Sequence, residues 1–390
     1  MNNKKQILEG SHAIALAIQN IEPAVVSAYP ITPQTHIVED LAKLKADGKA
    51  KFEYIRAESE FAAASIVLGA SAAGSRVYSA TSSQGLLLMT EVLYNISGMR
   101  LPVVMTCANR AISAPINIWC DHSDVMSVRD AGWIQLFAAD HQEAVDSHIL
   151  AYKLAEKLNL PVMINVDGFI LTHSYETVII PTAKEIKKYL PKHSPKKGAY
   201  LDPNNPATMG AFFPPSHYME TRESLHEDLK TGLKIIKDEY KIFKKIFKNK
   251  AAIAAVGDNN GLIGYYGPKN PETILVAMGS MVGTVREAIK KEKKVGLLKI
   301  SCYRPFPAEE INRLIKGVKN IAVLEKAVSP GQFGPLYSDL KAGLGFAGDK
   351  RQNINNYIVG LGGRDVTQKM IEKIIKDSNR QNNSLKFIGK

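Results

Sequence analysis

Short apolar runs alternate with longer segments of helical periodicity through the first half of the chain. The runs, which are rich in β-branched residues, lie at residues 24–28, 77–80, 103–107 and 162–166. The helical segments lie at about residues 12–19, 58–73, 85–97 and 142–158. Continuous apolar runs separated by helices are typical of parallel strands that are buried on both faces. The pattern therefore predicts an α/β fold, a parallel sheet with helices on both faces.

A connector and a long helix are expected after this sheet. Residues 177–215 are irregular and rich in proline and lysine, which indicates a connecting segment. A helix is expected from Ser224, which has the spacing of a capping box with Glu227, to residue 249.

A second, smaller α/β domain is expected to follow, because strand, turn and helix patterns begin again. Its strands are predicted at residues 273–277, 295–300, 321–324 and 357–359. A turn at 279–283 and a helix at 284–291 separate the first two of these strands. The predicted domains are residues 1–250, with the connector and long helix at about 177–250, and residues 251–390.

Composition narrows the class of protein. The chain has 390 residues, 45% of them hydrophobic and 23% charged, which is enough to bury a full core. No apolar run approaches the roughly 20 residues that span a bilayer, and no signal-peptide core follows the first residues. Cys107, Cys120 and Cys302 form no Cys-x-x-Cys pair, so any redox centre is expected on another chain. We expect a soluble, cytoplasmic protein with no membrane contact.

The net charge of +12 does not by itself predict nucleic-acid binding. Between residues 234 and 250 the lysines alternate with apolar and aromatic residues at helical spacing, as on a helix with one solvated face. The aromatic residues are therefore expected in the core, not stacked on bases. The charge favours anionic cofactors or an acidic protein partner.

A proline-rich turn, Tyr29-Pro30-Ile31-Thr32-Pro33-Gln34-Thr35, directly follows the first predicted strand. Pro30 and Pro33 restrict the backbone on both sides of Thr32, so its hydroxyl is held rigidly at the carboxyl end of a strand. Ligands bind at this edge of open α/β sheets. Taken alone, the segment also fits a stiffened loop without function.

Two further segments carry polar groups near predicted helix starts. Glu58 and Glu60 precede a run of small residues, where a partly desolvated glutamate can share a proton with a ring nitrogen. The alternative is that both acids only favour the helix dipole. The hydroxyl-rich turn at 80–89 can hold an anion or a cofactor edge, or its hydroxyls can simply cap a helix.

Arg110 follows the third predicted strand, and the acidic segment 121–124 lies shortly after it. An arginine at a strand's carboxyl end can bind a carboxylate with two parallel hydrogen bonds. The alternative is a surface arginine paired with Asp121 or Asp124. The sequence leaves open whether Asp121 and His122 touch a cofactor or brace Arg110.

The segments 29–35, 58–60, 80–89, 109–111 and 121–124 together resemble, in the same order, the alpha subunit of the pyruvate:ferredoxin oxidoreductase family. Segments 303–307 and 360–365 resemble the family's last portion, which is similar to the carboxyl-terminal domain of transketolases. The resemblance implies a thiamine diphosphate-binding fold of the pyrimidine type, followed by a transketolase C-terminal-like domain.

The resemblance also implies roles for individual residues. Glu60 matches the catalytic glutamate that hydrogen-bonds the aminopyrimidine ring of thiamine diphosphate, with Glu58 as a minor alternative. Pro30 lies against the cofactor in the matching family segment. Thr32 and Arg110 match the residues that bind the substrate carboxylate.

The chain lacks the Gly-Asp-Gly pattern, with an asparagine some 25 to 30 residues later, that holds magnesium and diphosphate in thiamine enzymes. The resemblance therefore implies no metal in this chain, with Mg²⁺ and [4Fe-4S] clusters on partner subunits and thiamine diphosphate shared with a beta subunit. The expected assembly is a heterotetramer with beta, gamma and delta subunits. It would convert pyruvate and coenzyme A to acetyl-CoA and CO₂, with ferredoxin or flavodoxin as acceptor. Alternatives are 2-oxoisovalerate or 2-oxoglutarate as substrate, or a non-catalytic assembly subunit.

Overall fold

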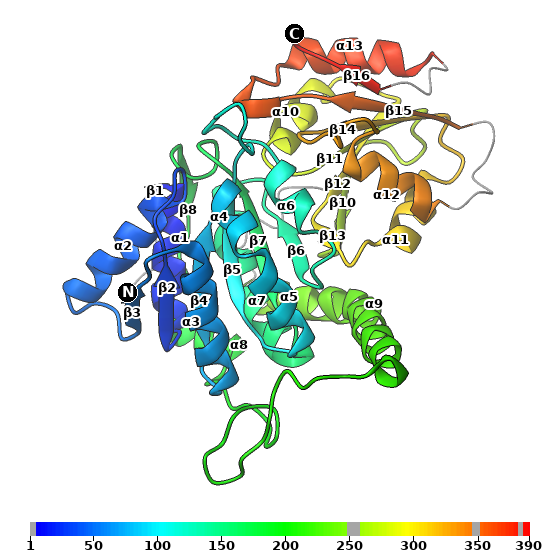
Figure 1. Ribbon diagram of the computed structural model, residues 1–390. Helices are drawn as coiled ribbons and strands as arrows, with labels where there is room; N and C mark the ends of the chain where they lie inside the picture. The colour runs from blue at the N-terminus through cyan, green and yellow to red at the C-terminus, as the bar shows by residue number, and fades with distance from the viewer. Residues whose placement is uncertain (1–4, 248–257, 345–351, 381–384) are drawn as a thin grey trace.

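Two seven-stranded sheets, each with its own helices, and one small two-stranded sheet make up the described part of the protein (Figure 1). The computed structural model describes residues 5–247, 258–344, 352–380 and 385–390. The predicted boundary between residues 250 and 251 lies outside these described residues. Among the described residues, none of the helices combines the length and the apolar character that crossing a bilayer requires.

The first sheet confirms the predicted parallel arrangement. Its strand order is β13-β6-β7-β5-β4-β2-β3, with only β13 antiparallel to its neighbour. The strands are β2 (Val25–Ala28), β3 (Glu53–Arg56), β4 (Val77–Thr81), β5 (Val104–Asn109), β6 (Ile134–Phe137), β7 (Val162–Asp167) and β13 (Cys302–Arg304). The four predicted runs are β2, β4, β5 and β7, and each agrees with the structure to within two residues at either end.

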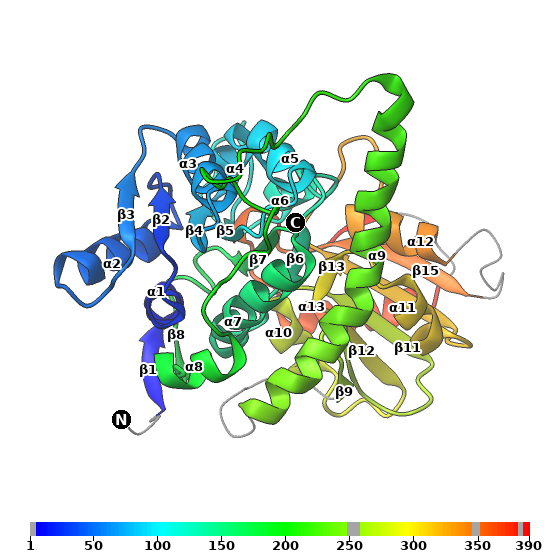
Figure 2. The same cartoon turned by 90° about the horizontal axis from the view of Figure 1, so that it is seen from below.

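Helices cover both faces of this sheet (Figure 2). They are α1 (Gly10–Ile21), α2 (Thr35–Ala46), α3 (Glu60–Ala72), α4 (Ser83–Leu88), α5 (Thr90–Gly98), α6 (Ser123–Ser127) and α7 (His141–Leu158). The single helix predicted at 85–97 is wrong, since α4 and α5 are separate. Thr90 Oγ1 donates to the Leu87 carbonyl oxygen at 2.7 Å, and such side-chain bonds compete with the helical ladder.

The predicted connector contains regular structure. Strand β8 (Tyr175–Val178) pairs with β1 (Gln6–Glu9) in a small antiparallel sheet. Helix α8 (Ala183–Tyr189) begins with a capping box formed by Thr182 and Glu185.

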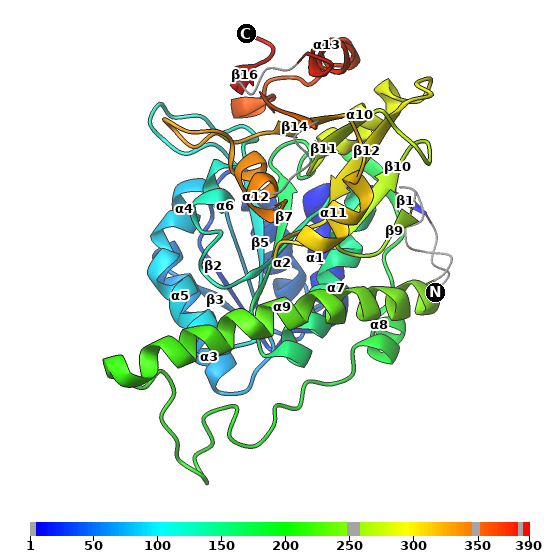
Figure 3. The ribbon, with the colours of Figure 1, turned by 90° about the vertical axis from the view of Figure 1, so that its right-hand side faces the viewer.

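The long helix α9 (Pro215–Ile246) begins at Pro215, so the predicted start at Ser224 is wrong. Proline suits the first position of a helix because that position needs no backbone donor. The aromatic residues that the sequence placed in the core between residues 234 and 250 are buried, namely Tyr240, Phe243 and Phe247, whereas Tyr218 near the start of α9 is exposed. The helix contacts both halves of the protein, since Glu239 pairs with Lys157 of α7 and Lys237 with Glu310 of α11 (Ala308–Ile315) (Figure 3).

The second sheet has the order β16-β15-β14-β11-β12-β10-β9. Its strands are β9 (Asp258–Asn259), β10 (Ile263–Tyr266), β11 (Thr273–Ala277), β12 (Val295–Ile300), β14 (Asn320–Glu325), β15 (Asn353–Ile358) and β16 (Leu385–Phe387). Its other helices are α10 (Met281–Ala288), α12 (Pro335–Gly343) and α13 (Gln368–Ser378). Strands β11, β12, β14, β15 and β16 are parallel to one another. The predicted strands of this part of the chain are thus confirmed, although β15 begins earlier than expected.

Candidate active site

Thr32 and Arg110 meet at the carboxyl edge of the first sheet. Thr32 lies in the turn after β2, and Arg110 follows β5. Arg110 Nη1 donates to the main-chain carbonyl oxygen of Thr32 at 2.9 Å, while the Thr32 side chain is exposed. Pro30 is exposed in the same turn. The structure therefore brings the two predicted carboxylate-binding residues into direct contact.

The guanidinium of Arg110 is fixed on a second side. Its Nε donates to the Asn117 carbonyl oxygen at 3.0 Å, and the residue is only 7% exposed. Burial lowers the pKa of Arg110, and the nearby Asp124 charge opposes this shift. The alternative of a surface arginine paired through its guanidinium with Asp121 or Asp124 is wrong, because Asp124 accepts from the Arg110 main chain instead.

Glu60 is the first residue of α3, and its burial distinguishes it from Glu58. Ser59 caps the helix, since its Oγ accepts from the Ala62 N–H at 3.1 Å. Glu60 is 8% exposed, whereas Glu58 is exposed. Within the described part of the chain, no group donates a hydrogen bond to the Glu60 carboxylate. The Glu60 carboxylate is therefore available to accept a hydrogen bond from a ligand that carries a donor.

The hydroxyl-rich turn lies against this glutamate. A Cβ at Gly85 would lie 2.6 Å from Glu60 Oε1 and 2.5 Å from Thr81 Oγ1, so only glycine fits. Thr81 Oγ1, Ser82 Oγ and the Gln84 amide nitrogen are buried and have no hydrogen-bond partner among the described residues. Ser82 stands at the N-cap of α4 without forming a side-chain cap, so the simple capping alternative fails there. This set of unpaired polar atoms fits a ligand with its own donors and acceptors.

Asp124 links the Arg110 turn to the hydroxyl-rich turn. Its Oδ2 accepts from the main-chain N–H groups of Arg110 and Ser83, both at 3.0 Å. Its Oδ1 accepts from the Asn109 side chain at 3.2 Å. Burial raises the pKa of Asp124 to about 6, although these hydrogen bonds oppose the shift. The sequence singled out segment 121–124 but did not identify this role, because the donors are main-chain groups.

We expect activity to fall as the pH drops through about 6, because a protonated Asp124 accepts these hydrogen bonds less well. Burial raises the pKa of Asp124 in the folded protein above its ordinary value of 3.8. The protonated group therefore stabilises the fold fully below pH 3.8, and this contribution is lost as the pH rises through about 6. Its titration therefore does not unfold the protein on the acid side. Asp124→Asn should lower turnover about tenfold and remove the inflection near pH 6, in pH–rate profiles of the assembled enzyme. An unchanged inflection in this variant would contradict the assignment.

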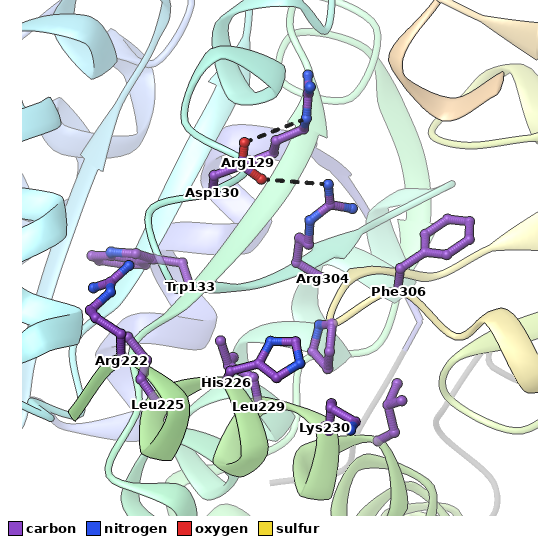
Figure 4. Close-up of a pocket in the computed structure, with 13 residues that line it drawn as sticks. Arg129, Asp130, Trp133, Arg222, Leu225, His226, Leu229, Lys230, Arg304 and Phe306 are labelled. Carbon is purple, nitrogen blue, oxygen red and sulfur yellow. Dashed lines mark ion pairs between the residues drawn. The ribbon is translucent and has the colours of Figure 1, made fainter. Parts of the chain in front are cut away.

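A separate cavity of about 390 Å³ lies between α9 and residues 129–133 and 304–306 (Figure 4). Arg222, His226 and Lys230 of α9 line one side, and Arg304 and Trp133 lie opposite. Trp133 directly precedes β6, so this cavity opens at the amino end of the strand. Because the predicted site residues lie at the carboxyl edge, the cavity is not the candidate active site.

Two family models match this chain. Residues 17–241 match the family model described as pyruvate flavodoxin/ferredoxin oxidoreductase, thiamine diphosphate-binding, and residues 271–371 match pyruvate:ferredoxin oxidoreductase core domain II. The pyruvate synthase subunit PorA of Methanocaldococcus jannaschii is 47% identical over 377 residues, with 95% of this chain and 94% of the relative covered. The ketoisovalerate oxidoreductase subunit VorA of Pyrococcus abyssi is 40% identical, with 96% and 93% covered.

Solved structures show the same fold. The 2-oxoglutarate:ferredoxin oxidoreductase of Magnetococcus marinus has a TM-score of 0.72 at 22% identity. The match covers 96% of this chain and spans 65% of that protein's chain. A split-gene transketolase has a TM-score of 0.55 at 13% identity, with 94% of this chain and 96% of that chain covered.

The family match defines a thiamine diphosphate-binding protein of the 2-oxoacid oxidoreductase class. Within that class, the chain belongs to the pyruvate:ferredoxin oxidoreductase family.

Proposed function

We propose that this chain is the alpha subunit of a heteromeric pyruvate:ferredoxin oxidoreductase. The reaction oxidises pyruvate with coenzyme A to acetyl-CoA and CO₂, and passes the electrons to ferredoxin or flavodoxin. One observation carries the proposal. The same edge of the first sheet holds both Glu60, whose carboxylate accepts no hydrogen bond from the described residues, and the contact between Arg110 and Thr32. One group suits a cofactor ring nitrogen, and the other suits a substrate carboxylate.

The residues of this edge fit thiamine diphosphate, which supplies the nucleophile and electron sink for decarboxylation when it is bound. Glu60 would share a proton with a ring nitrogen, and Pro30 would lie against the ring. The unpaired polar atoms of Thr81, Ser82 and Gln84 give this part of the site further hydrogen-bonding capacity. Arg110 and the Thr32 hydroxyl would orient the pyruvate carboxylate so that the adjacent carbonyl carbon faces the cofactor.

The remaining parts of the site would come from other chains. The sequence lacks the Gly-Asp-Gly pattern for magnesium and diphosphate, and its three cysteines are buried singly, without a Cys-x-x-Cys pair. A beta subunit would hold Mg²⁺, the diphosphate and a [4Fe-4S] cluster, and gamma and delta subunits would complete a heterotetramer. Residues 1–250 would form the pyrimidine-binding domain, and residues 251–390 the transketolase C-terminal-like domain.

A substrate panel tests this proposal. The enzyme is purified anaerobically with its native partners and assayed by viologen reduction, with and without coenzyme A, on pyruvate, 2-oxoisovalerate and 2-oxoglutarate. We expect the highest kcat/KM with pyruvate, a dependence on coenzyme A, and no activity of this chain alone. A preference for 2-oxoisovalerate, the substrate type named for the VorA relative, would keep the family and change the substrate. A complex without bound thiamine diphosphate would contradict the proposal.

A further inference from the structure

A buried ion cluster joins the two sheets next to the candidate active site. Asp167 ends β7 of the first sheet, and Lys326 directly follows β14 of the second. Lys326 Nζ lies 2.6 Å from Asp167 Oδ2, with side-chain exposures of 3% and 1%. Ser280, which follows β11, donates to the same oxygen through its N–H at 3.1 Å and its hydroxyl. We call Asp167, Lys326, Ser280 and His122 the interdomain cluster.

The charges of this cluster are balanced within the protein. Burial raises the pKa of Asp167, but Lys326 and His122 outweigh that effect and hold it well below its ordinary value. An ionised carboxylate only accepts, so His122 Nε2 donates to Asp167 Oδ1 at 2.8 Å. Cys120, His122 and Asp167 are grouped closely enough for a metal ion, yet Lys326 Nζ lies 3.5 Å from Cys120 Sγ and already supplies the cation. The cluster is therefore a buried ion pair in which Lys326, not a metal ion, supplies the positive charge.

The loops that follow β14 and β15 also hydrogen-bond to residues 111–122, which we call the bridging segment. The His122 N–H donates to the Lys326 carbonyl oxygen at 2.8 Å, and the Gly363 N–H to the Cys120 carbonyl oxygen at 2.8 Å. Asn117 Nδ2 donates to the Gly362 carbonyl oxygen at 3.2 Å. A Cβ at Gly363 would lie 2.3 Å from Trp119 Cβ, so this close approach requires glycine.

The bridging segment in turn holds Arg110. The Asn117 carbonyl oxygen accepts from Arg110 Nε at 3.0 Å, and the Ala111 N–H donates to the Trp119 carbonyl oxygen at 3.1 Å. At its other end, His122 precedes α6, whose Asp124 accepts from the Arg110 main chain. The Lys326 side chain is thus linked through Asp167 to His122 at the end of the bridging segment, and that segment contacts both the guanidinium and the main chain of Arg110.

We propose that Lys326 and the glycine loop 360–363 are positioning residues, which fix the Arg110 guanidinium for the substrate carboxylate through the bridging segment. This inference rests on the proposed function and assigns a role to the second domain. Neither Lys326 nor the loop needs to touch substrate. Loss of the contacts would let Arg110 move away from its productive position, and small displacements of an orienting group are costly in rate.

The test compares two buried lysines in the assembled enzyme. Lys326→Met removes the interdomain cluster's cation, and Lys326→Arg restores it. Lys299→Met is the matched control, because Lys299 on β12 is 1% exposed and pairs with Glu143 of α7, which also joins the two halves. In the described structure Lys299 has no hydrogen bond or ion pair with the bridging segment. Both Met variants lose a buried pair and should lose thermal stability.

We expect Lys326→Met to raise the KM for pyruvate by about ten- to a hundredfold, Lys299→Met to leave it unchanged, and Lys326→Arg, which keeps the charge but puts a larger group in the buried site, to raise it less than Lys326→Met. Hydrogen exchange should become faster in the bridging segment of Lys326→Met and stay unchanged there in Lys299→Met. This exchange measurement needs no turnover, so it separates failure of this inference from failure of the proposed substrate. Equal effects of the two Met variants, on KM or on exchange in the bridging segment, would overturn the inference.

A second variant covers the case in which Lys326→Met does not assemble. Asn117→Ala removes the bond to Gly362 and leaves no buried charge. It also removes the acceptor of the Trp119 N–H, so exchange is judged on the other amides of the bridging segment. It should also raise the KM for pyruvate and speed exchange in the bridging segment. Unchanged values in an assembled Asn117→Ala enzyme would count against the inference.

Discussion

Replacing Glu60 with Gln in the assembled enzyme is expected to lower kcat by about 10²- to 10⁴-fold, the usual contribution of a positioned acid or base. Glutamine has nearly the same shape, so the packing against Gly85 and Thr81 should persist. It cannot exchange a proton with a ring nitrogen, and that exchange is the role proposed for the carboxylate. The loss should therefore appear in kcat more than in the KM for pyruvate.

The direct measurement is exchange of the reactive carbon-bound proton of bound thiamine diphosphate with deuterium. We expect this exchange to slow in Glu60→Gln in proportion to turnover. Glu58→Gln is the matched control, because Glu58 lies two residues earlier and is exposed. Full turnover in Glu60→Gln would support the alternative of a non-catalytic assembly subunit, and a loss confined to Glu58→Gln would move the role to that residue.

Most strands that could be predicted from the sequence are buried on both faces, although the short strand β6 (Ile134–Phe137) is equally buried and was missed. Strand β12 (Val295–Ile300) is buried throughout and was predicted with its observed bounds. The edge strand β3 reads Glu-Tyr-Ile-Arg and is mostly exposed, so no apolar run marks it. Strand β15 was only partly predicted because it buries asparagines. Asn356, for example, donates to Glu325 at 2.6 Å, a contact that hydropathy does not reveal.

The residues of the candidate site could be predicted from their types and their positions after strands. The hydrogen bonds and ion pairs that join them could not. Thr32 and Arg110 could be selected because each follows a strand, and the carboxyl ends of parallel strands share one edge. Their contact, however, joins residues 78 positions apart through a main-chain oxygen, which no side-chain pattern encodes. The hydrogen bonds of Asp124 and the ion pair of Lys326 were missed for a similar reason. Lys326 lies 159 positions from Asp167, and its burial depends on how the two sheets meet.

Replacing Arg110 with Met is expected to lower kcat/KM for pyruvate by about 10²- to 10³-fold, through loss of carboxylate orientation. In the structure, Nε and Nη1 of Arg110 are held by the carbonyl oxygens of Asn117 and Thr32, which leaves N–H groups of the same rigid fork for a carboxylate. Lysine has three donors on one atom and cannot reproduce this arrangement. Arg110→Lys should therefore recover only a small part of the loss.

The Arg110 and Glu60 variants should differ in which step they affect. Deuterium exchange on the bound cofactor needs no substrate carboxylate, so it should stay normal in Arg110→Met while the KM for pyruvate rises. Arg56→Met is the control, because Arg56 ends the neighbouring strand β3 at the same edge but is exposed. Slowed exchange in Arg110→Met would mean that the arginine acts on the cofactor site, and an equal loss in Arg56→Met would mean that only the charge of this edge matters. Normal exchange, a raised KM and an unaffected Arg56→Met together would assign carboxylate binding to Arg110.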